Sequence, residues 1–258
     1  MPSKAAVSAA SNALLPATSE DAGFAGRFTM PRVTWQTVIA VFRKDWRSEW
    51  RTRAALNAIA LFAVASPIAL SFSVARQTLE PETIAGLLWT VLLFAALVGL
   101  SRAFVKEEES GTAALLRLSY PSEAVLWGKA LFNLALLLAT QLAAVPIFIV
   151  LLQARVARPE WLVLALLAGD IGLAVVSAIL GAMAGQARAR GALFAAIAVP
   201  VLLPLLVAAS ATTAAALGAV GGVAGSPGAF WSGMQIILAY DVAMTAAAWM
   251  LFDFVWAS

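Results

Sequence analysis

The sequence contains no cysteine and no histidine among its 258 residues, and only 12% of them are charged. Without cysteine the chain forms no disulfide and has no thiolate nucleophile. Without either residue it lacks the usual zinc ligands and the commonest axial ligand of haem iron. It also lacks the GxxxxGK[ST] motif that holds nucleotide phosphates in P-loop ATPases. We therefore expect no catalytic residue, no metal site and no bound ATP in this chain.

Apolar residues, in contrast, are in large excess, at 62% of the sequence with a mean hydropathy of +0.89. No soluble core needs so many, so the composition indicates an integral membrane protein. Runs long enough to cross a bilayer lie at 54–74, 84–100, 130–152, 161–184, 192–217 and 233–252. The sequence predicts an all-α, polytopic membrane protein with six transmembrane helices and no soluble catalytic domain.

The basic residues are distributed unevenly along these runs. If the N-terminus is cytoplasmic, 14 of the 17 lysines and arginines fall on the cytoplasmic side, and only Arg76, Arg155 and Arg158 fall on the other. Cytoplasmic loops of membrane proteins carry such an excess. We therefore expect both termini in the cytoplasm.

Residues 1–31 are rich in alanine and serine and have no continuous apolar core, which predicts a disordered tail rather than a secretory signal. A cleavable organelle-targeting peptide is the alternative, and Glu20, Asp21 and the scarcity of arginine disfavour it. The expected domains are this tail, an interfacial helix at 32–53 and a six-helix membrane domain at 54–258.

The stretch at 35–53 has the periodicity of an amphipathic helix. Its aromatic and aliphatic residues recur at steps of three and four and share one face: Trp35, Ile39, Phe42, Trp46 and Trp50. The remaining surface carries Arg43, Lys44, Arg47 and Arg51. This pattern is typical of a helix in the membrane interface, with indole rings at headgroup depth and basic groups toward anionic lipid. The alternative is a cytoplasmic extension of the first span.

A charged segment separates the second and third spans and must face water. A short surface helix is expected to open at Gly111 and Thr112 and to close at Tyr120 and Pro121, with Ser122 capping the next helix. Because such a segment is held to the membrane at both ends, it can transmit a force from outside the membrane to the helices within it. The alternative is an ordinary connecting loop.

Polar or helix-breaking residues also occur within the predicted spans. Asp170 and Asp241 are central in the fourth and sixth spans, where an ionised side chain costs about 2.5 to 3.5 kcal/mol. They suit a proton relay or, alternatively, a hydrogen bond between helices. Pro200 and Pro204 predict a kink in the fifth span, which serves either as a gate or in packing.

The sequence resembles the haem exporter protein B (CcmB) family, the permease of the cytochrome c maturation ABC transporter. The resemblance rests on an ordered set of segments that includes FRKDWRSEWRTR, GLLWTVLLFAALVGLSRAFVKEEESG, the 121–129 stretch ending in WGK, and LLAGDIGLAVVSAILGAMAGQARARG. VPVLLPLL and the closing LAYDVAMTAAAWMLFDFVW complete it. It implies an ABC-2-like bundle in the bacterial inner membrane. The implied role is non-catalytic, in haem export or in the release of a haem-loaded chaperone on the periplasmic side.

The resemblance also implies partners and sites. The partners are a CcmA-like ATPase subunit that binds ATP, a CcmC-like haem-handling subunit, a small CcmD-like subunit and a CcmE-like haem chaperone, but no nucleic acid. The residues assigned to ATPase coupling are Arg102, Lys106, Glu107, Glu108, Glu109, Gly111, Pro121 and Lys129, with Trp35, Phe42, Trp46, Trp50 and Arg51 as the interfacial anchor. Only methionine or tyrosine, such as Met183, Met234 or Tyr240, is available as a haem ligand, so we expect no axial ligation by this chain.

Three other functions fit part of the sequence. An ABC-2 permease for lipid, polysaccharide or drug shares the six spans and the coupling loop. A proton-coupled secondary transporter would use Asp170 and Asp241, although the two halves of the chain show no detectable repeat. A pure assembly scaffold would tolerate neutral substitutions at Asp170 and Pro200.

Overall fold

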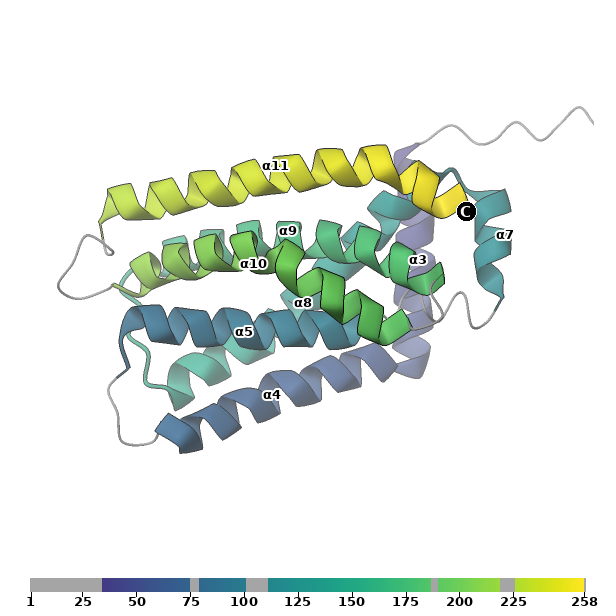
Figure 1. Cartoon of the computed structure of the whole chain (residues 1–258). Coiled ribbons are helices and arrows are strands. Elements are labelled where there is room, and N and C mark those ends of the chain that lie inside the picture. The colour runs from purple at the N-terminus through teal and green to yellow at the C-terminus, as the bar shows by residue number, and fades with distance from the viewer. Residues whose placement is uncertain (1–33, 75–78, 101–110, 187–189, 219–225, 258) are drawn as a thin grey trace, which may run out of the picture. The chain divides into compact units, whose positions relative to one another are not determined.

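The computed structural model describes residues 34–257, except 75–78, 101–110, 187–189 and 219–225. The described residues form helices and connecting segments without a β-strand (Figure 1). The helices are α3 (Trp35–Thr52), α4 (Ala54–Val74), α5 (Pro81–Leu100), α7 (Thr112–Ser119), α8 (Ser122–Leu151), α9 (Pro159–Gln186), α10 (Arg190–Leu217) and α11 (Pro227–Ala257). The predicted tail at 1–31 lies outside the described residues.

The helices confirm the prediction of an all-α, polytopic membrane protein. Within the described residues, α4, α8, α9, α10 and α11 are long and apolar enough to cross a membrane, and α5 adds a shorter apolar stretch at Pro81–Leu97. Each of the six predicted spans lies on one of these helices. In a bilayer only a helix satisfies all of its own backbone hydrogen bonds, which explains why the apolar runs and the helices coincide.

Helix α9 is the centre of the bundle. It packs against α5, α8, α10 and α11. Its glycines allow this close packing: the ring of Trp89 from α5 lies directly over Gly169 and leaves no room for a side chain there. The indole Nε1 of Trp89 donates a hydrogen bond to Thr213 Oγ1 of α10 at 2.9 Å. One tryptophan therefore joins three helices.

Helix α10 contains both Pro200 and Pro204 and remains helical through them, while its axis changes direction along its length (Figure 1). Proline removes a backbone hydrogen bond and exposes carbonyls of the preceding turn. Val201, within the proline-containing turn, has its carbonyl oxygen bonded to the hydroxyl of Tyr240 on α11, at 2.7 Å. The bend in α10 is thus supported by α11.

The expected short helix between the second and third spans is α7. Gly111 precedes it with a φ of 68°, a left-handed conformation that favours glycine, and Tyr120 ends it in an extended conformation. The prediction that Ser122 caps the next helix, α8, is wrong. Pro121 occupies the cap position without a side-chain hydrogen bond, and the hydroxyl of Ser122 instead donates to Asp253 Oδ1 on α11. A partner distant in sequence has replaced the local cap.

Candidate functional site

The described side chains of α7, at residues 115–119, divide between the bundle and the surface. Leu116 is buried, and the guanidinium carbon of Arg117 lies 5.2 Å from the ring centroid of Trp256 on α11. Leu115 is 65% exposed and Leu118 is 70% exposed, so these two side chains point away from the bundle. Leucines at this spacing on a short helix offer a compact apolar contact for another protein.

The first turn of α8 is joined to the last turns of α11. Besides the bond from Ser122 to Asp253, Glu123 Oε1 accepts a hydrogen bond from Trp249 Nε1 at 3.0 Å. Helix α7 contacts the same end of α11 through Trp256. Helix α7 is therefore joined to α8, which follows it in sequence, and to α11, which it contacts in space.

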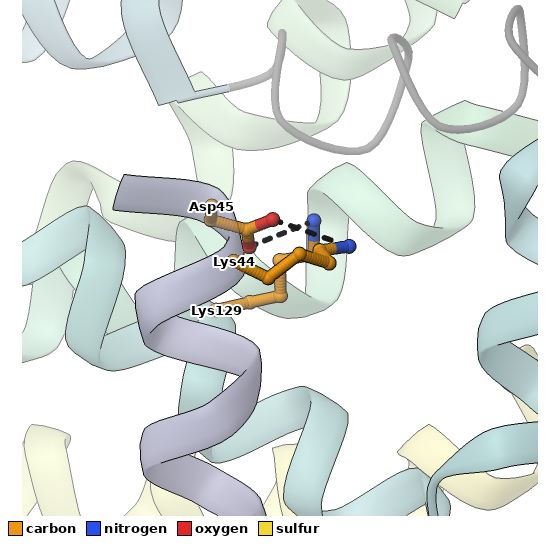
Figure 2. A network of polar contacts seen from close by, with 3 residues as sticks. All are labelled: Lys44, Asp45 and Lys129. Atoms are coloured by element: carbon orange, nitrogen blue, oxygen red, sulfur yellow. Dashed lines mark ion pairs between the residues drawn. The ribbon is translucent and has the colours of Figure 1, made fainter. Parts of the chain in front are cut away.

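Lys129 is completely buried, with a side-chain exposure of 0%, and forms an ion pair with α3. Figure 2 shows the carboxylate of Asp45 beside the amino groups of Lys44 and Lys129. Lys129 Nζ lies 3.1 Å from Asp45 Oδ2, and Lys44 Nζ lies 3.3 Å from Asp45 Oδ1. Because a buried charge is costly unless it is paired, this contact ties the position of α3 to that of α8.

The two helices also approach closely beside the ion pair. Gly128 lies against Val41, and a side chain at position 128 would collide with it. The residues of α3 that face the bundle are Val38, Val41, Asp45 and Glu49. In the sequence, the spacing of apolar residues indicates the aromatic face of α3. No local pattern indicates that Asp45 and Glu49 are buried.

Three rings of the predicted aromatic face of α3, those of Phe42, Trp46 and Trp50, stack on one another beside this buried face. The ring centroids of Phe42 and Trp46 are 5.9 Å apart, and those of Trp46 and Trp50 are 6.1 Å apart. Trp35 and Trp50 are largely exposed, as are Arg43, Arg47 and Arg51. Arg53, with a left-handed φ of 52°, separates α3 from α4. This break shows that α3 is not a straight continuation of the first span.

Within the membrane domain, the two aspartates lie in different environments. Asp170 is completely buried on α9, and its Oδ1 accepts a hydrogen bond from Gln141 Nε2 of α8 at 2.7 Å. Asp241 is buried on α11, against Gly172 of α9. Asp170 and Gly172 are two residues apart, which places them on nearly opposite sides of the helix. The two carboxylates are therefore not brought together into one site.

The other predicted site residues are distributed as follows. Arg102, Lys106, Glu107, Glu108 and Glu109 lie outside the described residues. Gly111 and Pro121 flank α7, whereas Lys129 is inside the bundle and is held by α3. Of the candidate haem ligands, Met234 is buried, Met183 is partly exposed, and the hydroxyl of Tyr240 is bonded to Val201. We interpret these three as packing residues.

Comparison with known proteins identifies the family. The family model described as "CcmB protein" matches residues 36–253, from the first turn of α3 almost to the end of α11. The chain belongs to the CcmB family. A curated relative, "Heme exporter protein B" of Rhodobacter capsulatus, is 32% identical over 123 residues, which cover 47% of this chain and 56% of the relative. The aligned part thus spans about half the length of that relative. No solved structure matches this CcmB-family chain.

Proposed function

We propose that this CcmB-family chain is the transmembrane permease subunit of an ABC transporter for cytochrome c maturation. In this role it takes part in haem export, or in the release of a haem-loaded chaperone to the periplasmic side, driven by a separate ATPase subunit. Family membership and the name of the R. capsulatus relative support this assignment. The observation that carries it is α7, a short helix that exposes Leu115 and Leu118 beside α8 and α11.

The proposed coupling contact is the exposed surface of α7, defined by Leu115 and Leu118. A push on this surface passes through Arg117 to Trp256 on α11 and through the first turn of α8 to Asp253. Both helices pack on α9, so the displacement enters the centre of the bundle. The charged segment before α7, with Arg102, Lys106 and the three glutamates, is proposed to add polar contacts to the same ATPase subunit.

The proposed assembly follows from this role. The chain lies in the bacterial inner membrane with both termini cytoplasmic, beside CcmA-like, CcmC-like, CcmD-like and CcmE-like partners. ATP is bound by the ATPase subunit, because no P-loop motif occurs in this sequence. Haem is ligated by a histidine-bearing partner. This subunit performs no catalysis itself.

Helix α3 is proposed to anchor the permease in the membrane interface. Its exposed charges, Arg43, Lys44, Arg47 and Arg51, are all basic, whereas its carboxylates face the bundle. Each basic group near an anionic bilayer surface contributes about 1 kcal/mol. The stacked rings of Phe42, Trp46 and Trp50 suit headgroup depth. The pair of Asp45 and Lys129 links this anchor to α8.

The coupling proposal is tested with the double variant Leu115→Glu and Leu118→Glu. Because losing central apolar contacts of an interface costs about 2 kcal/mol, we expect the ATPase recovered with the membrane complex to fall by about tenfold or more. Holocytochrome c production should fall with it. The measurement is affinity purification of the complex with quantification of each subunit, together with the cytochrome c yield in the same cells.

The matched control is Glu160→Lys, which changes the charge of an exposed residue in the first turn of α9. It should leave ATPase recovery and cytochrome yield unchanged. A parallel reversal of Glu107, Glu108 and Glu109 to lysine tests the preceding segment and should uncouple ATP hydrolysis from cytochrome production. Normal cytochrome yield with the ATPase fully released from the membrane would refute the proposal.

A further inference from the structure

Asp241 occupies an unusual position where three helices of the bundle meet. Its side chain projects from α11, is only 7% exposed and lies against Gly172 of α9 and close to Leu205 of α10. Neither carboxylate oxygen has a hydrogen-bond partner among the described residues. Glycine at position 172 is required, because any side chain there would occupy the place of the carboxyl group.

Among the described side chains of α9, α10 and α11, none is a lysine or arginine that could pair with this carboxyl group. Helix α9 contains no lysine or arginine, and its ionisable residues are Glu160 in its first turn and Asp170, which is turned toward Gln141. Helix α11 contains no basic residue either, and Tyr240 beside Asp241 has its hydroxyl bonded to Val201. The described side chains of α10, from residue 197 to 217, include no ionisable group.

Among the described residues, an ionised carboxylate at this position would have neither a counter-ion nor a hydrogen-bond donor. Even on a mild scale, such a charge near the centre of a bilayer costs about 2.5 to 3.5 kcal/mol. A neutral carboxylic acid avoids most of this cost, because only a polar group, and not a charge, is then desolvated.

We propose that Asp241 is a proton-binding site, and that its occupancy controls the contact of α11 with α9 at Gly172. With the proton bound, the neutral carboxyl group packs against Gly172 and the three helices stay closed. When the proton leaves for water, the carboxylate requires hydration, and α11 separates from α9 far enough to admit it. The O–H bond of the acid breaks and the proton is taken up by the entering water, so no other reactant is needed.

A movement of α11 at this site also affects the bend in α10. Leu205 directly follows Pro204, and Tyr240, the neighbour of Asp241, bonds to Val201 in the same turn of α10. Separation of α11 from α9 therefore also pulls on the carbonyl that Tyr240 bonds. Protonation of one residue thereby biases the packing of α9, α10 and α11 together.

Infrared spectroscopy of the full chain in lipid, with the subunits that purify with it, tests the protonation directly. We expect a C=O stretching band of a neutral carboxyl group at neutral pH that is lost in Asp241→Asn. The matched variant Asp170→Asn, which changes the other buried carboxyl group of the membrane domain, should leave that band component in place. A wild-type spectrum without a component that depends on Asp241 would overturn the proposal.

The opening is tested by thiol labelling, for which the absence of native cysteine provides a clean background. Leu205→Cys places one fully buried thiol beside the site. The rate of maleimide labelling of this thiol is measured in the otherwise native chain and in the Asp241→Asn background. We expect the ratio of the first rate to the second to rise about tenfold from mildly acidic to mildly alkaline pH. A tenfold change corresponds to about 1.4 kcal/mol.

A rate ratio that does not change with pH would overturn the opening step. Neither measurement requires ATP, haem or an ATPase partner. A failure of the proposed transport function therefore leaves both results interpretable, and a failure of the proton site leaves the coupling through α7 intact.

Discussion

At the scale of single residues, the contact that organises the cytoplasmic end of the proposed topology is the buried pair of Asp45 and Lys129. The lysine lies on α8, one position before the predicted third span, and the aspartate lies on α3, 84 positions earlier. A buried pair contributes little net stability relative to an apolar pair, but breaking it leaves one charge uncompensated. It therefore specifies where α3 lies more than how stable the protein is.

This asymmetry gives a prediction. Lys129→Met should destabilise the protein by about 3 kcal/mol, because Asp45 then loses its buried partner and keeps Lys44, whose side chain is 42% exposed. Asp45→Leu combined with Lys129→Met should recover most of the loss. The measurement is the thermal unfolding midpoint of the purified chain for the two single variants and the double variant. Additive losses in the double variant would show that the two side chains do not act as a pair.

The sequence indicated the two carboxyl groups within the spans but not the residues that they contact. Asp170 and Asp241 stand out in the sequence because an ionised side chain is costly in a bilayer. That cost does not reveal that Gln141 of α8 donates a hydrogen bond to Asp170, or that Asp241 packs on Gly172. The resemblance to the CcmB family implied that Lys129 is the last residue of the coupling segment. The burial of Lys129 depends on the approach of α3, which only the tertiary structure shows.

At the scale of helices, the fit between α5 and α9 depends on one glycine. The Trp89 ring fills the space over Gly169, so that a side chain at this position meets a large ring that is itself fixed by Thr213. Glycine in a membrane helix thus serves the approach of a neighbour rather than flexibility. Not every glycine of these helices has this role, because Gly86 on α5 has nothing within 4 Å of where a side chain would begin.

The contrast between these two glycines gives a matched pair of variants. Gly169→Val should destabilise the bundle by about 1 to 3 kcal/mol through overpacking, whereas Gly86→Ala should be neutral or stabilise it by up to about 1 kcal/mol through helix propensity. Thermal unfolding of both variants in the same detergent measures the difference. Equal effects at the two positions would contradict the packing that we describe for Trp89.

The helices themselves were largely predictable from the sequence. Each predicted span coincides with a helix because backbone hydrogen bonding in lipid leaves few alternatives, and α7 was expected from Gly111 and the Tyr120–Pro121 pair. The capping of α8 was not predictable, because local preference favoured Ser122 as a cap while Asp253, 131 residues away, takes its hydroxyl. Local sequence thus indicates where these helices form, whereas a contact with a distant helix determines how α8 begins.

At the scale of the whole molecule, two features meet in one bundle. At one end, α7 exposes two leucines and is tied to α8 and α11, which suits contact with an ATPase subunit. Within the bundle, the same α11 carries Asp241 and supports the bend of α10. Helix α11 therefore links the proposed coupling surface to the proposed proton site.

The proposed transport function depends most on the contact between α7 and the ATPase subunit. A single cysteine at Leu118→Cys, in a chain without native cysteine, should form a cross-link with the ATPase subunit of the intact complex when a short thiol-reactive photocross-linker is attached. Leu142→Cys, at an 82% exposed position on α8, is the control and should give no ATPase product. A complex in which the probe at position 118 reaches no ATPase, while the ATPase stays bound, would contradict the account.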